Sequence, residues 1–241
     1  GACMNRKLLK RILVTSAIAV LGVSTSFAAL VTERDQSVDT APSVGMYRFQ
    51  VPAELQGPYN STAVANLTTS MEKEPNTLSM NVAHVKGNPS ESYVVEIYKD
   101  LAAIETHRKS DQYQAFVNEV GSKLTNRKMY DVQSVLLFEK KDALSIVNDG
   151  KAVVTLTEFT VNSNDGDTVQ RQYELDIERA VRDDAGYKAG YVLRERNAKN
   201  HWYVIQIYSD QDALTKHLNS PGYHFMMSQI QGSLQGVTTK V

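Results

Sequence analysis

The sequence predicts an α+β fold in which two tandem ferredoxin-like domains pack sheet to sheet, as a dimeric α/β barrel within one chain. Residues 93–113 recur as residues 203–223 without a gap, and nine of these 21 positions are identical, where chance would give about one or two. Each copy follows the order strand, helix, two strands, helix, strand, which is the ferredoxin-like arrangement. Two helices cover only one face of such a sheet, so the two open faces are expected to cover each other.

The first copy is expected over residues 44–140. An alternating strand comes first, then a segment with apolar residues three and four apart that stops before Pro75. Asp100 and Ser110 are expected to cap the helical segments that follow the third strand. The expected strands are 44–51, 77–85, 92–98 and 130–139, and the expected helices are 59–74 and 100–124.

The second copy is expected over residues 152–241, after a linker at 141–151 that contains the turn residues Asn148-Asp149-Gly150. Asp210, and Ser220 followed by Pro221, repeat the two helix caps. The expected strands are 152–160, 187–195 and 202–208, and the expected helices are 167–183 and 211–234. Only residues 237–241 remain for a last strand, which is therefore expected to be short or incomplete.

Residues 1–29 have the features of a signal peptide that starts at Met4, with Gly1–Cys3 upstream of it. Basic residues precede an apolar run at 12–23, which is shorter than the about 20 residues that cross a bilayer. Ser26-Phe27-Ala28 supplies small residues at the cleavage positions. We expect cleavage near Ala28, export to a bacterial periplasm, no stable membrane insertion afterwards, and a flexible start over 30–43. An uncleaved N-terminal anchor is the alternative.

Charge and cysteine content exclude several classes of function. The leader holds four of the 26 basic residues and none of the 27 acidic ones, so the mature chain would carry a formal charge of −5. A nucleic-acid partner is not expected, because phosphate binding needs a concentrated basic surface. The single cysteine, Cys3, lies before the leader, which excludes thiol chemistry and thiolate metal sites in the mature chain. Phosphate-loop, metalloprotease and nucleophile-elbow motifs are missing too, and we expect no cofactor and no metal.

Residues 95–116, VEIYKDLAAIETHRKSDQYQAF, resemble the antibiotic biosynthesis monooxygenase family. That family has a strand ending in an acidic residue, any residue and an aromatic one, followed by a helix of the form ALEAHLxSPHFKAF. Residues 205–225 match the pattern again, and residues 74–78, EPNTL, resemble the family's EPGTL segment before the second strand. The resemblance covers about 44–139 and 152–241.

The resemblance implies a dimeric α/β barrel and a small-molecule ligand of aromatic or quinol-like type, and it leaves a further homo-oligomer open. Activities in the family include cofactor-independent oxygenation of quinols and polyketide phenols, haem degradation, and isomerisation of a small sugar-like signal. The haem-degrading branch uses a first-strand Asn, a Trp where His107 and His217 stand, and a His where Val117 and Met227 stand. Neither first strand holds an Asn, so haem degradation is not expected.

His107 and His217 are candidate catalytic bases, because an imidazole can take a proton from a phenol or enol near neutral pH. The alternative is a histidine that packs at a helix kink and bonds a backbone carbonyl.

Glu96 is the third catalytic candidate. The alternation of the strand places Val94, Glu96 and Tyr98 on one face, and the more apolar Tyr93, Val95 and Ile97 are expected under the helices. Glu96 would then face the other domain, as a base with a raised pKa or as a hydrogen-bonding residue between the domains.

The other candidates are expected to bind substrate. They are Tyr98, Tyr113, Gln206, Tyr208, Tyr223, His224 and Trp202. His224 and Trp202 occur only in the second copy, which favours that copy as the active half, although drift alone gives the same asymmetry.

The leading hypothesis is a cofactor-independent monooxygenase-like enzyme that acts on a small aromatic or quinol-type compound. A deprotonated phenol can itself reduce oxygen, so the protein needs a base, polar groups to hold the anion and a dry cavity. The alternative is a non-catalytic ligand-binding or assembly protein with a degenerate barrel.

Overall fold

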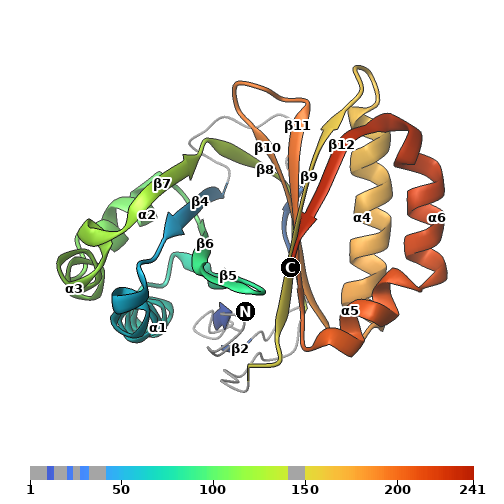
Figure 1. Cartoon of the computed structure of the whole chain (residues 1–241). Coiled ribbons are helices and arrows are strands. Elements are labelled where there is room, and N and C mark those ends of the chain that lie inside the picture. Colours follow the sequence, from blue (N-terminus) through green and yellow to red (C-terminus); the bar gives the residue numbers. More distant parts are fainter. Residues whose placement is uncertain (1–9, 14–20, 24–27, 33–41, 141–149) are drawn as a thin grey trace, which may run out of the picture. The chain divides into compact units, whose positions relative to one another are not determined.

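The chain forms two compact units (Figure 1). The computed structural model describes residues 10–13, 21–23, 28–32, 42–140 and 150–241, with side chains for the last two ranges. Unit 1 contains residues 42–130 and unit 2 contains residues 131–140 and 151–241. Each unit is an open sheet with helices, so the α+β class and the two tandem ferredoxin-like domains are confirmed. The packing of one sheet on the other stays a prediction.

Unit 1 has the predicted order of elements. They are β4 (Ser43–Gln50), α1 (Gln56–Lys73), β5 (Thr77–Val85), β6 (Asn88–Tyr98), α2 (Leu101–Arg108), α3 (Asp111–Glu119) and β7 (Thr125–Tyr130). Strand β6 lies antiparallel between β4 and β5, and β7 follows β4 at the edge. Asp100 and Ser110 accept hydrogen bonds from the backbone N–H groups of Ala103 and Tyr113, which confirms both predicted caps.

Unit 2 repeats this order. Its elements are β8 (Val132–Glu139), β9 (Val153–Val161), α4 (Gly166–Asp183), β10 (Tyr187–Glu195), β11 (His201–Tyr208), α5 (Gln211–Leu218), α6 (Pro221–Ile230) and β12 (Leu234–Lys240). Asp210 and Ser220 cap α5 and α6, as predicted. Helices α4 and α5 pack on β10 of this sheet.

The face of each central strand that looks toward the helices was predicted wrongly. Val94 belongs to a core cluster with Tyr59 and Leu67 of α1, and the ring of Tyr98 lies 5.7 Å from that of His107 in α2. Glu96 therefore lies beneath the helices of its own unit. The pattern misled because Val95 and Ile97, on the opposite face, are buried as well, so hydrophobicity does not identify the helix-covered face.

The segment predicted as one strand over 130–139 belongs to two sheets. It breaks at Asp131: β7 pairs with β4 in unit 1, whereas β8 pairs with β10 in unit 2. Val135, Leu136 and Phe138 lie in the core cluster of unit 2. A run of apolar residues predicts a buried strand but not the sheet to which the strand belongs. Sequence alone therefore could not show that the chain passes from the first sheet to the second at Asp131.

The last strand is longer than predicted. Helix α6 ends at Ile230 and a short 3₁₀ turn follows at Gln231–Ser233, so β12 begins at Leu234 and pairs with β9. Its register shifts near Gly236, whose φ of 62° lies in the left-handed region that glycine adopts freely. The helix predicted from the sequence ended at residue 234, four residues beyond the end of α6 at Ile230.

The N-terminal predictions fall mostly on residues 1–9, 14–20, 24–27 and 33–41, which lie outside the described residues. The parts described are short strands: β1 (Lys10–Leu13), β2 (Leu21–Val23) and β3 (Ala28–Thr32). Strand β1 pairs with β5, and β3 pairs with β8. The flexible start over 30–43 stays a prediction. The signal peptide and its cleavage stay predictions. Most of the predicted linker, residues 141–149, also lies outside the described residues.

Leu136→Ala tests the position of β8. Leu136 has no exposed surface and lies in the cluster that contains Trp202, the one tryptophan of the chain. We expect the substitution to lower the free energy of unfolding by about 2–5 kcal/mol, measured by urea titration with tryptophan fluorescence. Met129→Ala, on the neighbouring strand β7 and 69% exposed, is the control and should leave the midpoint unchanged. An unshifted midpoint for Leu136→Ala would contradict the assignment of β8 to unit 2.

Candidate active site

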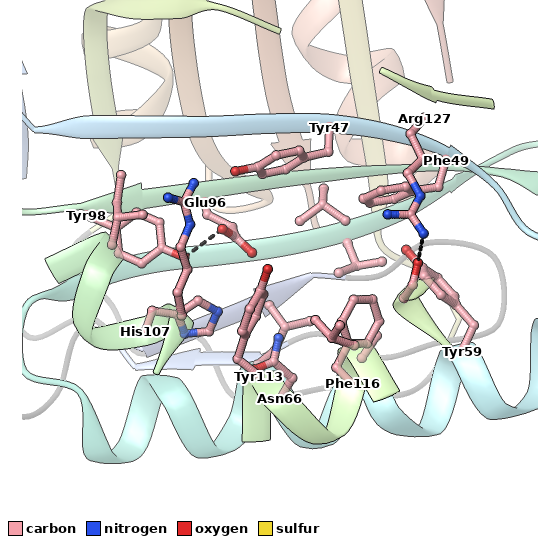
Figure 2. A pocket seen from close by; sticks show the side chains of 18 residues that line it. Tyr47, Phe49, Tyr59, Asn66, Glu96, Tyr98, His107, Tyr113, Phe116 and Arg127 are labelled. Atoms are coloured by element: carbon pink, nitrogen blue, oxygen red, sulfur yellow. Dashed lines mark hydrogen bonds between the residues drawn. The ribbon is translucent and has the colours of Figure 1, made fainter. Parts of the chain in front are cut away.

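Unit 1 encloses a cavity of about 240 Å³ between its sheet and its three helices (Figure 2). Strands β4, β5 and β6 and helices α1, α2 and α3 all contribute to its lining. The polar and aromatic lining residues are Tyr47, Phe49, Tyr59, Asn66, Glu96, Tyr98, His107, Arg108, Tyr113, Phe116 and Arg127. For comparison, an apolar cavity of about 150 Å³ holds a benzene molecule. The space in unit 1 therefore suits a ligand of one or two fused rings.

Aromatic side chains form two opposite walls of this cavity. On the sheet side, the rings of Tyr47 and Phe49 lie nearly parallel, with an angle of 9° between their planes. On the helix side, Tyr113 and Phe116 project from α3 toward them (Figure 2). Aromatic walls on two sides favour aromatic ligands, because a ligand ring can stack or make edge contacts with them.

His107 is held by Glu74 and keeps one ring nitrogen free. Its Nδ1 lies 3.0 and 3.1 Å from the two carboxylate oxygens of Glu74. A carboxylate only accepts hydrogen bonds, so Nδ1 carries the proton and Nε2 of the neutral ring carries a lone pair. Nε2 is buried and has no hydrogen-bond partner among residues 42–140 and 150–241. His107 also lines the cavity, so a ligand in the cavity lies beside this ring.

The carboxylate of Glu74 is fixed by further donors. Thr77 donates to one oxygen at 2.9 Å, and the Gln112 amide donates to the other at 2.6 Å. Burial alone would raise the pKa of Glu74, but the hydrogen bond and charge of His107 together lower it below its ordinary value. Glu74 therefore stays ionised and orients the imidazole, as the third member of a catalytic triad does.

Glu96 provides a second carboxyl group with the opposite shift. It lines the cavity as a half-buried residue, and its burial raises its pKa. The hydroxyl of Tyr98 donates to it at 2.6 Å. A carboxyl group that keeps its proton can donate a hydrogen bond to a ligand oxygen and, when ionised, can take a proton.

The corresponding space in unit 2 is filled by side chains. Residues 110 positions apart occupy equivalent places, and Ala63 and Thr77 of unit 1 correspond to Tyr173 and Tyr187. Both tyrosines are buried in the core cluster of unit 2, where Tyr187 packs edge-on against Tyr208. Two lining tyrosines change the other way, Tyr59 to Val169 and Tyr47 to Thr157, so the filling depends on which positions carry the large side chains.

His217 has partners for both ring nitrogens. The hydroxyl of Tyr208 lies 2.6 Å from Nδ1, and a carboxylate oxygen of Asp176 lies 2.8 Å from Nε2. His217 and Asp176 are each about 1% exposed at their side chains. This arrangement stabilises the unit and leaves no nitrogen free for a ligand, in contrast to His107.

The structure separates the predicted site residues by copy. His107, Glu96, Tyr98 and Tyr113 come together around the cavity of unit 1. Those of the second copy lie in a filled core: His217, Gln206, Tyr208 and Trp202 are buried, and Tyr223 packs against the core cluster. His224 is exposed and contacts the backbone carbonyl of Leu218.

Sequence reasoning missed Glu74, Tyr47, Asn66 and Arg108 as site residues. The repeat held a signal for three of them, because Tyr47, Asn66 and Arg108 correspond to Thr157, Asp176 and Leu218. Within residues 42–140 and 150–241, no three His, Cys, Asp or Glu side chains gather as a metal site requires. In the same part of the chain, no helix combines the length and apolar character needed to span a bilayer.

Comparison with known proteins agrees with the tandem organisation. The sequence model of the antibiotic biosynthesis monooxygenase family matches residues 44–119 and again residues 152–228. No curated protein matches the chain.

Solved structures share the two-domain fold. A proposed monooxygenase from Lactobacillus acidophilus is 18% identical, with a TM-score of 0.76 over 83% of this chain and 92% of that one. A second, from Fusobacterium nucleatum, is 20% identical, with a TM-score of 0.70 over 83% and 91%. An anthrone oxidase-like protein is 11% identical, with a TM-score of 0.51 over 84% and 90%. At these identities the likeness shows the fold alone.

The two histidines should differ in their effect on stability. His217→Ala removes buried hydrogen bonds at both ring nitrogens, while Asp176 keeps its ion pair with Arg179, so we expect a loss of about 1–3 kcal/mol in the free energy of unfolding. His107→Ala should lose clearly less, because Glu74 keeps Thr77 and Gln112 as donors. Urea titrations of both variants, followed by circular dichroism, measure the difference. Equal losses would contradict the view that only His217 is fully engaged.

Glu96→Gln tests the raised pKa. A carboxyl whose pKa is higher in the folded protein than in the unfolded chain holds its proton more tightly when folded. Its contribution to stability is therefore present below the unfolded value of about 4.3 and decreases as pH rises from there toward the folded pKa. Glutamine stays neutral and can still accept from Tyr98.

We therefore expect the Tm of Glu96→Gln, relative to the unsubstituted protein, to rise between pH 4 and pH 8. The exposed Glu119, changed to Gln, is the control and should show no such trend. A pH-independent difference for Glu96→Gln would show that its carboxyl ionises as freely as an exposed one.

Proposed function

Because the chain belongs to the antibiotic biosynthesis monooxygenase family, we propose that it is a cofactor-independent oxygenase for a small phenolic or quinol-type compound, with its active site in unit 1. One observation carries the proposal: His107 lines a cavity of ligand size, its Nδ1 is held by Glu74, and its buried Nε2 has no hydrogen-bond partner in the part of the chain that the structure describes.

His107 is the proposed general base. The ligand hydroxyl would place its proton on Nε2, and the ring would then be an imidazolium whose Nδ1–H still donates to the carboxylate of Glu74. The negative charge of Glu74 stabilises that imidazolium, so the transfer is more favourable than it would be to a histidine alone. Tyr113 and Tyr98 lie around the ring at 5.1 and 5.7 Å between centroids and restrict its orientation.

The oxygenation step balances without a cofactor. The phenolate gives one electron to oxygen, and the radical pair combines at the ring carbon opposite the phenolic oxygen. Loss of the hydrogen from that carbon then breaks the O–O bond, leaving one oxygen atom as a quinone carbonyl and the other as water. The proton held by His107 and the hydrogen of the ring carbon together form this water. Overall, a phenol and O₂ become a quinone and water.

Unit 2 is proposed to support the fold. Its corresponding space holds Tyr173 and Tyr187, and His217 is engaged at both nitrogens. The sequence favoured the second copy as the active half. This proposal instead assigns the active site to the first copy. Export, with cleavage near Ala28, stays a prediction that the mass of the protein from its host would test.

A binding protein is the second candidate function. It is favoured by the Tyr98 hydroxyl, which donates to Glu96 and so engages one of the two groups able to take a proton. Saturable binding of phenols without oxygen consumption would support this alternative over catalysis.

Oxygen uptake over a panel of phenols and quinols tests the proposal. We expect His107→Ala to lower the rate about 10²–10⁴-fold, the usual contribution of a general base. We expect Glu74→Gln to lower it less, because the amide retains an acceptor for Nδ1 but loses the charge.

His217→Ala is the matched control in the other copy. Measured at a temperature where circular dichroism shows it folded, it should keep most of the activity. No turnover by the unsubstituted protein, or full turnover by His107→Ala, would refute the assignment of the base.

A further inference from the structure

Two arginines line the cavity of unit 1, and apolar residues occupy both equivalent positions in unit 2. Arg108 corresponds to Leu218, and Arg127 corresponds to Val237. The two arginines thus occur in the unit that has the cavity, whereas the exposed Leu218 and Val237 of unit 2 carry no charge. A cation beside an open cavity can recognise an anionic ligand.

Arg108 lies at the mouth of the cavity. It lines the cavity, yet half of its side chain is exposed to solvent. Its ion pair with Glu105, at 3.2 Å on the same helix, joins two exposed groups. Such surface pairs contribute little to stability, so a ligand carboxylate can replace Glu105.

Arg127 is less free to bind. Its Nε donates to the backbone carbonyl of Leu124 at 3.1 Å, and one of its terminal nitrogens donates to that of Gly121. These bonds hold the guanidinium at the other end of the cavity, beside Phe49 (Figure 2). Arg127 adds positive electrostatic potential to the cavity. Arg108 is the better candidate to donate hydrogen bonds to a ligand, because no backbone carbonyl holds its guanidinium in the described hydrogen bonds.

The carboxyl groups of the site do not cancel this positive character. Glu74 is surrounded by His107, Thr77 and Gln112, and the Tyr98 hydroxyl donates to Glu96, whose pKa is raised by burial. The Tyr47 hydroxyl remains a donor, because burial raises its pKa to about 12. A ligand therefore meets donors at Arg108 and Tyr47, and an acceptor at Nε2 of His107.

We propose that the cavity binds a planar hydroxyaryl carboxylic acid of one or two rings, with its hydroxyl at His107 and its carboxylate at Arg108. The inference rests on the proposed function for the role of His107. The ring lies between the aromatic walls of β4 and α3. His107 and Arg108 both line the cavity from α2, so one ligand can contact both.

Calorimetric titration without oxygen tests the ligand class, with 1-hydroxy-2-naphthoate and 1-naphthol as probes that share one ring system. We expect the unsubstituted protein to bind the acid about tenfold or more tightly than the neutral phenol, as a hydrogen-bonded charge implies. Arg108→Leu, which introduces the residue of the second copy, should abolish this preference and keep the affinity for 1-naphthol. Leu218→Arg is the control and should retain the preference.

Three results would overturn the inference: equal affinities in the unsubstituted protein, a preference that survives Arg108→Leu, or no binding of either probe. Oxygen uptake, measured separately, distinguishes this inference from the proposed function. Arg108-dependent binding of hydroxyaryl acids without turnover would leave the inference standing and refute the oxygenase. Turnover of neutral phenols with no preference for acids would do the reverse.

Discussion

The contact between a strand tyrosine and a helix histidine is the interaction on which both units depend. Tyr98 with His107, and Tyr208 with His217, bring a helix down onto the end of the central strand with ring centroids 5.7 and 5.6 Å apart. The contact is the same, but the hydrogen bonds around it differ. His217 bonds on both sides of its ring, whereas His107 bonds only to the side that faces Glu74 and Ser70. The number of engaged nitrogens decides whether the histidine only holds the fold or can also act on a ligand.

The same backbone encloses a packed core in one copy and a cavity in the other through a few changes of side-chain volume. Replacing a large core residue by alanine commonly costs about 2–5 kcal/mol, and more as the residual cavity grows. A cavity of about 240 Å³ in unit 1 is therefore a considerable weakness for a small domain. Unit 2, with Tyr173 and Tyr187 in the corresponding space, has a continuous core. A fused pair can tolerate an open cavity in one copy because the other copy is well packed.

The two carboxyl groups near His107 have opposite protonation preferences, although both are partly or fully surrounded by protein. Glu74 has three donors and a lowered pKa, and Glu96 has one hydroxyl donor and a raised pKa. Environments that separate the pKa values of neighbouring carboxyls are common in active sites, because one group can hold charge while the other holds a proton. Around His107, the carboxyl with the lowered pKa is behind the ring and the carboxyl with the raised pKa lines the cavity.

The sequence by itself determined the duplication, the order of elements and the four helix caps, because these follow from local spacing and from side chains that bond their own backbone. The sequence also identified His107 as a candidate base and Glu96 as a candidate carboxyl with a raised pKa. It could not identify the helix-covered face of β6, since both faces are buried, nor the sheet that receives β8, since apolar strands fit either one.

Only the tertiary structure decided which copy contains the cavity. That outcome depends on side-chain volume at positions far apart in the chain, such as Ala63 at the cavity of unit 1 against the buried Tyr173 in unit 2. It also depends on Glu74 at the end of α1 reaching His107 in α2, a contact between residues 33 positions apart that no local pattern specifies.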